Sequence, residues 1–134
     1  MTLALDTSVL VRILANQPQP LASQVIEDVA RRISAGDTMY VSNLVASEAY
    51  YAMQHHYGVD KRTILQSFKL MSEQVGFLFT EEVKRVLSIE GLEHANPGFV
   101  DRLIHGEGER CNMPVISCEK SFRRLPDTII IPTP

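Results

Sequence analysis

The chain has 134 residues, of which 45% are hydrophobic and 22% are charged. These proportions are ordinary for a globular protein, and the length suits one domain that buries a core without disulfides, so we expect a single domain over residues 1–134. The formal net charge is −3, whereas proteins that coat nucleic acid by charge alone are normally basic. If the chain acts on RNA or DNA, a divalent metal ion is the natural means of offsetting phosphate repulsion.

Neither a membrane span nor a signal peptide is evident. No window approaches the roughly 18 consecutive apolar residues of a membrane span, and Asp6 and Arg12 interrupt the apolar stretch that a signal peptide requires. The expected location is therefore cytoplasmic. The two cysteines, Cys111 and Cys118, form no CxxC pair and no cluster at zinc spacing, so we expect two buried thiols in a reducing compartment.

Short apolar runs alternate with helix-forming stretches along the chain. Strands are predicted at residues 3–5, 39–41, 75–79, 114–117 and 128–131. Helices are predicted at residues 9–14, 21–34, 43–56, 60–71, 80–89 and from residue 99, with a short turn or helix at 119–124. Strands that alternate with helices indicate an α/β fold with a mainly parallel central sheet.

Two carboxylates follow predicted strands directly. Asp6 ends the first strand, and Glu119 lies two residues after the strand that ends at Ser117. Sites in open parallel sheets form beyond the carboxyl ends of the strands, so we expect both acids at the same edge of the sheet. Each acid also has a simpler interpretation: Asp6 as a helix N-cap, and Glu119 as a first-turn acid favoured by the helix dipole.

A third acid, Glu48, falls within an apolar stripe of its predicted helix, formed by Leu44, Val45, Ala49 and Ala52. A carboxylate that faces the core is costly unless a charge or a ligand satisfies it. A metal or a catalytic cleft is the favoured interpretation, and a buried arginine partner is the alternative.

Asp101 shares no such feature. It lies off the apolar stripe of its predicted helix, which Phe99, Val100, Leu103 and Ile104 define. Helical periodicity alone therefore makes Asp101 a solvated first-turn acid.

Four segments in order resemble the motifs of the PIN-domain family, and most closely those of the VapC-type toxin ribonucleases of toxin–antitoxin pairs. They are residues 5–12 (LDTSVLVR), 47–50 (SEAY), 99–104 (FVDRLI) and 115–122 (VISCEKSF), with Tyr57-Gly58 where many members have the same pair. Two features depart from the family pattern. Glu119 stands where Asp is usual, and residues 104–111 are polar and contain glycine where small apolar residues are more common.

The resemblance implies a three-layer α/β/α domain that cleaves RNA phosphodiester bonds with Mg²⁺ or Mn²⁺, forms a homodimer and is inhibited by a small antitoxin protein. Such hard cations prefer oxygen ligands; they lower the pKa of bound water and stabilise the leaving oxygen. The resemblance assigns metal ligation, direct or through water, and catalysis to the acids, and polar support to neighbouring hydroxyls. The acids are Asp6, Glu48 and Asp101, with Glu119 serving a second metal or the attacking water, and the hydroxyls are those of Thr7, Ser8 and Ser117.

Other enzyme classes fit less well. A HAD-type phosphatase needs an Asp where Ser8 stands, and the GxGxxG and GxSxG motifs are absent. The histidines show no ligand spacing and are expected at the surface; they are His55, His56, His94 and His105. The remaining alternative is a catalytically weak or inactive PIN-like module that binds RNA or a protein partner.

Overall fold

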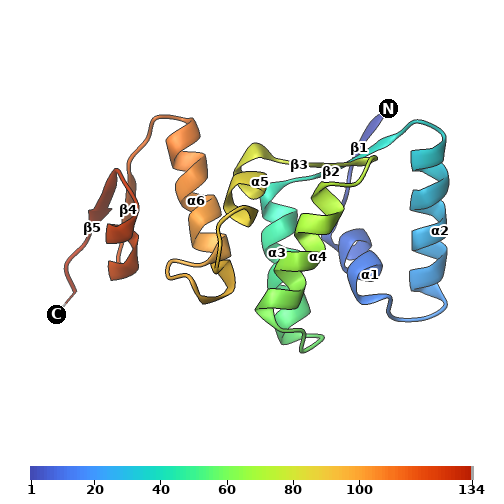
Figure 1. The fold of residues 1–134 in the computed structure, drawn as a ribbon, viewed down its shortest axis with the longest axis horizontal. Helices are drawn as coiled ribbons and strands as arrows, with labels where there is room; N and C mark the ends of the chain where they lie inside the picture. Colours follow the sequence, from blue (N-terminus) through green and yellow to red (C-terminus); the bar gives the residue numbers. More distant parts are fainter. Residues whose placement is uncertain (134) are drawn as a thin grey trace.

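A computed structural model describes residues 1–133 and shows an α/β protein (Figure 1). In chain order its elements are β1 (Thr2–Ala4), α1 (Thr7–Ala15), α2 (Leu21–Ser34), β2 (Thr38–Val41), α3 (Asn43–His55), α4 (Lys61–Ser72), β3 (Phe77–Phe79), α5 (Glu81–Leu87), the 3-10 helix η1 (Leu92–His94), α6 (Phe99–Arg110), β4 (Val115–Ser117), the 3-10 helix η2 (Lys120–Arg124) and β5 (Thr128–Ile130). All strand pairs in this part of the chain are parallel. The predicted fold class, α/β with a mainly parallel sheet, is confirmed and is consistent with the three-layer PIN-like architecture.

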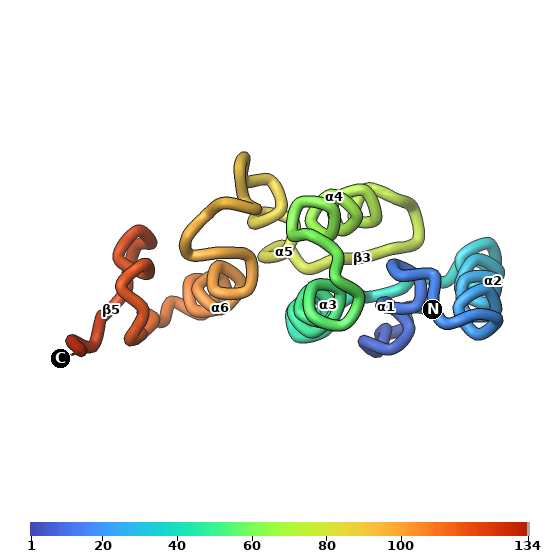
Figure 2. The backbone as a smooth tube through the Cα atoms, turned by 90° about the horizontal axis from the view of Figure 1, so that it is seen from below, coloured from blue at the N-terminus to red at the C-terminus, as the bar shows by residue number. Residues whose placement is uncertain are grey.

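The strands do not form one continuous sheet. Within residues 1–133, one sheet has the order β1-β2-β3 and a second consists of β4 and β5. Figure 1 places β4 and β5 at the opposite end of the molecule from β1, with α6, α5 and α3 between them. Figure 2, turned by 90°, shows the same separation, with β5 at one end and α1 and α2 at the other.

The two faces of the β1-β2-β3 sheet differ in burial. Leu5, Met39, Val41 and Phe79 alternate along their strands and join the core that α1, α3 and α4 complete. The opposite face, which we call the open face, carries residues that are exposed or half-buried, namely Thr2, Ala4, Tyr40 and Leu78. Helices therefore cover one face of this parallel sheet and leave the other face in contact with solvent.

Side-chain caps fix the starts of three helices. The side chains of Ser42, Asp60 and Thr80 accept hydrogen bonds from the backbone N–H groups three residues further on. Each bond satisfies one of the amide groups that a helix start leaves free. These helices begin within two residues of the predicted positions. Among the residues described, no helix is long and apolar enough to cross a membrane.

Candidate carboxylate site

Asp6 lies just beyond the carboxyl end of β1, at the N-cap position of α1. Its side chain makes no capping hydrogen bond within the described chain, so the simple capping role is not observed. Instead it accepts a 2.7 Å hydrogen bond from the Ser8 hydroxyl. That bond, followed by the backbone N–H of Thr7, lowers the pKa of Asp6. An exposed carboxylate held ionised in this way is available to a cation.

Glu48 lies on the exposed side of α3, and the prediction that it faces the core is wrong. Leu44, which defined the predicted stripe, is 69% exposed, and the buried face of α3 instead carries Ala46, Ala49, Tyr50 and Met53. The arginine alternative is not observed either, because none of the ion pairs in residues 1–133 includes Glu48. The carboxylate accepts a 3.2 Å hydrogen bond from the Thr7 hydroxyl, which links it to the residue after Asp6.

Asp101 lies in the first turn of α6 and is half-buried, whereas helical periodicity predicted a solvated acid. Phe99, two residues earlier, anchors this turn in the core, with its ring 4.9 Å from that of Tyr50 and 5.7 Å from that of Phe68. Burial raises the pKa of Asp101, and the negative charge of Glu119 raises it further. Asp101 and Glu119 are therefore electrostatic neighbours.

Glu119 lies two residues beyond the carboxyl end of β4 and is exposed. Its backbone N–H donates a 2.9 Å hydrogen bond to the Ser117 hydroxyl, which fixes the chain as it leaves the strand. Glu119 precedes η2, a 3-10 helix of five residues, and its side chain makes no capping bond in the described structure. The hydroxyls of Thr7, Ser8 and Ser117 thus each contact one of the predicted site residues.

The four acids form two pairs rather than one cluster. Thr7 joins Asp6 to Glu48 at the end of β1, and Asp101 neighbours Glu119 at the end of β4. Carboxylate oxygens are suitable donors for Mg²⁺ and Mn²⁺. However, residues 1–133 contain no group of three or more His, Cys, Asp or Glu side chains placed to hold a metal ion. Over these residues, one copy of the chain therefore supplies suitable carboxylate donors but does not bring three or more of them to one position.

A groove of about 470 Å³ opens beside Asp101, between α3 and the start of α6. Tyr51 and His55 line it, and their rings lie 4.2 Å apart with Tyr51 largely exposed. Lys61 lines the same groove and contributes a positive charge, beside the acids Glu93 and Asp101. Exposed rings beside a cation are features that single-stranded nucleic acid can use.

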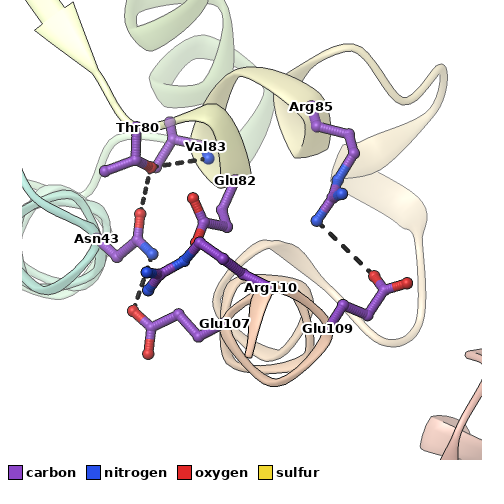
Figure 3. A network of polar contacts seen from close by, with 8 residues as sticks. All are labelled: Asn43, Thr80, Glu82, Val83, Arg85, Glu107, Glu109 and Arg110. Atoms are coloured by element: carbon purple, nitrogen blue, oxygen red, sulfur yellow. Dashed lines mark hydrogen bonds and ion pairs between the residues drawn. The ribbon is translucent and has the colours of Figure 1, made fainter. Parts of the chain in front are cut away.

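A second polar network holds α6 to α5 and α3 (Figure 3). Glu82 of α5 is only 6% exposed and pairs with Arg110 of α6. Burial, which alone would raise the pKa of Glu82, is outweighed by its backbone hydrogen bond and by Arg110, so the pKa is lowered. Asn43 of α3 donates a 2.8 Å hydrogen bond to Glu107. Sequence reasoning missed Glu82, although its i,i+4 spacing from the buried Val86 places it on the core side of α5.

One histidine and both cysteines differ in burial from the sequence prediction. His105 is buried rather than at the surface, with its Nε2 atom 2.7 Å from the Pro126 carbonyl oxygen. Because that oxygen can only accept, Nε2 carries the proton. Cys111 and Cys118 are exposed free thiols rather than buried ones.

The fold and the acids define a class: a parallel α/β domain with carboxylates beyond the carboxyl ends of its strands. Comparison with known families gives a specific match, because the family model described as PIN domain covers residues 3–127. No curated protein and no solved structure gave a significant match. The chain belongs to the PIN-domain family, whose members are generally nucleases.

Proposed function

We propose that the chain is a metal-dependent endoribonuclease that hydrolyses RNA phosphodiester bonds with Mg²⁺ or Mn²⁺. The observation that carries this proposal is the placement of carboxylates beyond the carboxyl ends of β1 and β4 in a domain of a nuclease family. Both strand ends present an acid at the same offset, Asp6 two residues after Ala4 and Glu119 two residues after Ser117. Ligand sites of open parallel sheets form beyond such strand ends.

The charge balance also supports metal dependence. The chain is acidic overall, and Asp6 is held in its ionised form. RNA phosphates would be repelled by such carboxylates unless a cation lay between them. Hard divalent cations prefer oxygen donors of this kind, and bound metal would supply Lewis acidity to the phosphodiester.

The groove beside Asp101 is the proposed contact for the RNA strand. Bases stack on exposed aromatic rings with little sequence preference, and the Tyr51–His55 pair offers such a surface. Lys61 offers a positive charge to a phosphate in the same groove. We therefore propose an unpaired RNA strand, such as a loop, as the substrate.

The biological role that we propose is that of a cytoplasmic toxin, forming a homodimer and neutralised by a small antitoxin protein. It is supported by the resemblance of residues 5–12 and of the three later segments to VapC-type toxins. The second candidate is a PIN-like module that binds RNA or a protein partner without cleaving. The separation of the acids into two pairs within one copy favours that candidate.

The two candidates are distinguished by cleavage of a structured RNA in Mg²⁺, in Mn²⁺ and in EDTA. Wild type should cut only with metal, and Asp6→Asn and Glu48→Gln should each lose at least about 100-fold in rate, since removing even a supporting group around a metal costs 10–100-fold. Glu73→Gln is the matched control, because Glu73 is an exposed acid at the end of α4.

Expression of wild type, but not of Asp6→Asn, should slow growth. Absence of cleavage in every metal would favour the binding module, and equal cleavage in EDTA would exclude metal dependence.

A further inference from the structure

We propose that a second copy of this chain completes the site: β4 of one copy pairs with the open edge of β1 in the other, in a reciprocal, domain-swapped dimer. The proposal deepens the nuclease function proposed above and rests on it. A reciprocal exchange of this kind closes with two-fold symmetry.

Both strands have an unpaired edge. Within the described residues β1 pairs with β2 alone, and β4 pairs with β5 alone. An unpaired strand edge presents a row of free N–H and C=O groups that another strand can pair with. Both sheets are parallel, so joining β1 to β4 in parallel would give one sheet in the order β3-β2-β1-β4-β5.

The backbone hydrogen bonds limit the register of that joint to steps of two residues. Met1 and Leu5 bond to β2, so by alternation the backbone groups of Thr2 and Ala4 point to the open edge. Val115 and Ser117 bond to β5, so those of Ile116 point to the open edge of β4. Among the registers that this alternation allows, the one that overlaps the two three-residue strands fully has Ile116 bonded between Thr2 and Ala4 in a parallel ladder. This register sets Ile116 beside Leu3, and it sets Glu119 beside Asp6.

The faces of the two sheets are complementary in this register. Ile116, Ile129 and Ile131 share one face of the β4-β5 sheet and are 63%, 55% and 45% exposed. Beside Leu3 they would join the face of the large sheet that packs on helices. The other face of β4 packs on α6, where Gly108 approaches the Val115 side chain. Helix α6 of the second copy would therefore lie over the open face, and the joined sheet would have helices on both faces.

The joint would also bring the two acid pairs together. Adjacent strands lie about 4.8 Å apart, so residues at equal offsets beyond β1 and β4 become neighbours. Asp6 and Glu48 of one copy would meet Asp101 and Glu119 of the other. Each dimer would then contain two sites, and each site would draw half of its carboxylates from each copy. This accounts for the lack of a metal-holding group of acids in the described part of a single chain.

A second copy fits the open edge better than the chain's own β4. The β4-β5 sheet is tied to α6 by the His105–Pro126 hydrogen bond, and α6 is tied to α5 and α3 by the network of Figure 3. Folding β4 back onto β1 of the same chain would require the β4-β5 sheet to leave α6, or α6 to leave α5, and so would break the His105–Pro126 hydrogen bond or the Glu82–Arg110 pair, in which Glu82 is buried. A second copy reaches β1 while all these contacts persist.

The first test is chemical cross-linking and does not depend on activity. In a Cys111→Ser, Cys118→Ser background, the double variant Leu3→Cys, Ile116→Cys is treated with a short bifunctional thiol reagent. The proposal predicts a covalent dimer. The matched control replaces Ile116→Cys by Ile129→Cys, which lies on the same face one strand further away, and should cross-link much less. Internally linked monomer, or no linkage between residues 3 and 116, would overturn the proposal.

The second test is complementation between two inactive variants refolded together. With shared sites, a mixed dimer of Asp6→Asn and Glu119→Gln has one site with both changes and one intact site. An equimolar mixture should regain about a quarter of wild-type cleavage, because random pairing makes half of the dimers mixed. Asp6→Asn mixed with Glu48→Gln should regain none. No recovery in the first mixture, with active wild type, would overturn the swap. Inactive wild type would instead contradict the nuclease function, and the cross-link would still decide the swap.

Discussion

Asp101 combines a half-buried position with the negative charge of Glu119 nearby. Folding raises the pKa of this acid, so the folded state holds the proton of Asp101 more tightly than the unfolded state does. The resulting gain in the free energy of unfolding is fully present below the unfolded pKa of the acid, near 3.9, and is lost as the pH rises. Asp101→Asn removes the disfavoured charge. In EDTA at pH 7 it should therefore raise Tm by roughly 1–4 °C, and the gain should shrink towards pH 4. Thermal melts at the two pH values measure this, with Glu73→Gln as the control. A lower Tm for Asp101→Asn at pH 7 would contradict the electrostatic account.

For individual residues, the sequence predicted which acids are site candidates more accurately than it predicted the burial and the partners of their side chains. The four acids were found from strand ends and motif resemblance, yet the burial of Glu48 was predicted wrongly because the core side of α3 is set by which neighbours pack on it. Asp101 and His105 are more buried than predicted for a related reason. Their environment comes from residues distant in sequence, Glu119 and Pro126. Helical periodicity carries no information on such partners.

Helix α6 and strand β4 meet at Gly108. A Cβ atom there would lie 2.8 Å from Val115 Cγ2 and 2.9 Å from the Met113 carbonyl oxygen. Gly108→Ala should therefore destabilise the fold by roughly 1–3 kcal/mol through overpacking. At Gly106 the nearest atoms belong to the side chains of Arg85 and Glu82, and the closest is the Arg85 guanidinium. Gly106→Ala should be near neutral, since the higher helix propensity of alanine offsets a small displacement of Arg85. Urea unfolding measures both variants, and equal effects would contradict the close α6–β4 contact.

The elements themselves were largely predictable, because capping residues and apolar periodicity act locally. Thr80 and Asp60 mark helix starts in the sequence and cap α5 and α4 in the structure. The polar, glycine-containing stretch at residues 104–111 departs from the family pattern. Its reason is tertiary: Gly108 admits Val115, and Arg110 reaches the buried Glu82. Neither contact could be predicted, because each joins elements whose packing depends on the whole fold.

At the scale of the whole molecule, the division of the strands into two sheets is the main feature that the sequence did not indicate. Strand positions and the parallel class follow from local patterns and from the alternation of strands with helices. The pairing of strand edges depends on where each strand lies in the folded chain. Here α6 lies between β4 and β1 and keeps them apart (Figure 1). Asp6 lies at the end of β1 and Glu119 at the end of β4, so the separation of the two sheets also separates the acids of the site.

If both acid pairs serve the same metal site, Mn²⁺ should stabilise the folded protein through both of them. A ligand that binds only the folded state stabilises it by about 2.7 kcal/mol at a hundredfold excess over its dissociation constant. Thermal melts in EDTA and in Mn²⁺ would compare wild type, Asp6→Asn, Asp101→Asn and the control Glu73→Gln. We expect wild type and Glu73→Gln to gain several degrees from Mn²⁺, and both site variants to gain much less. A site variant of either pair that gains as much as wild type would show that its pair does not hold the metal, and would contradict a shared site.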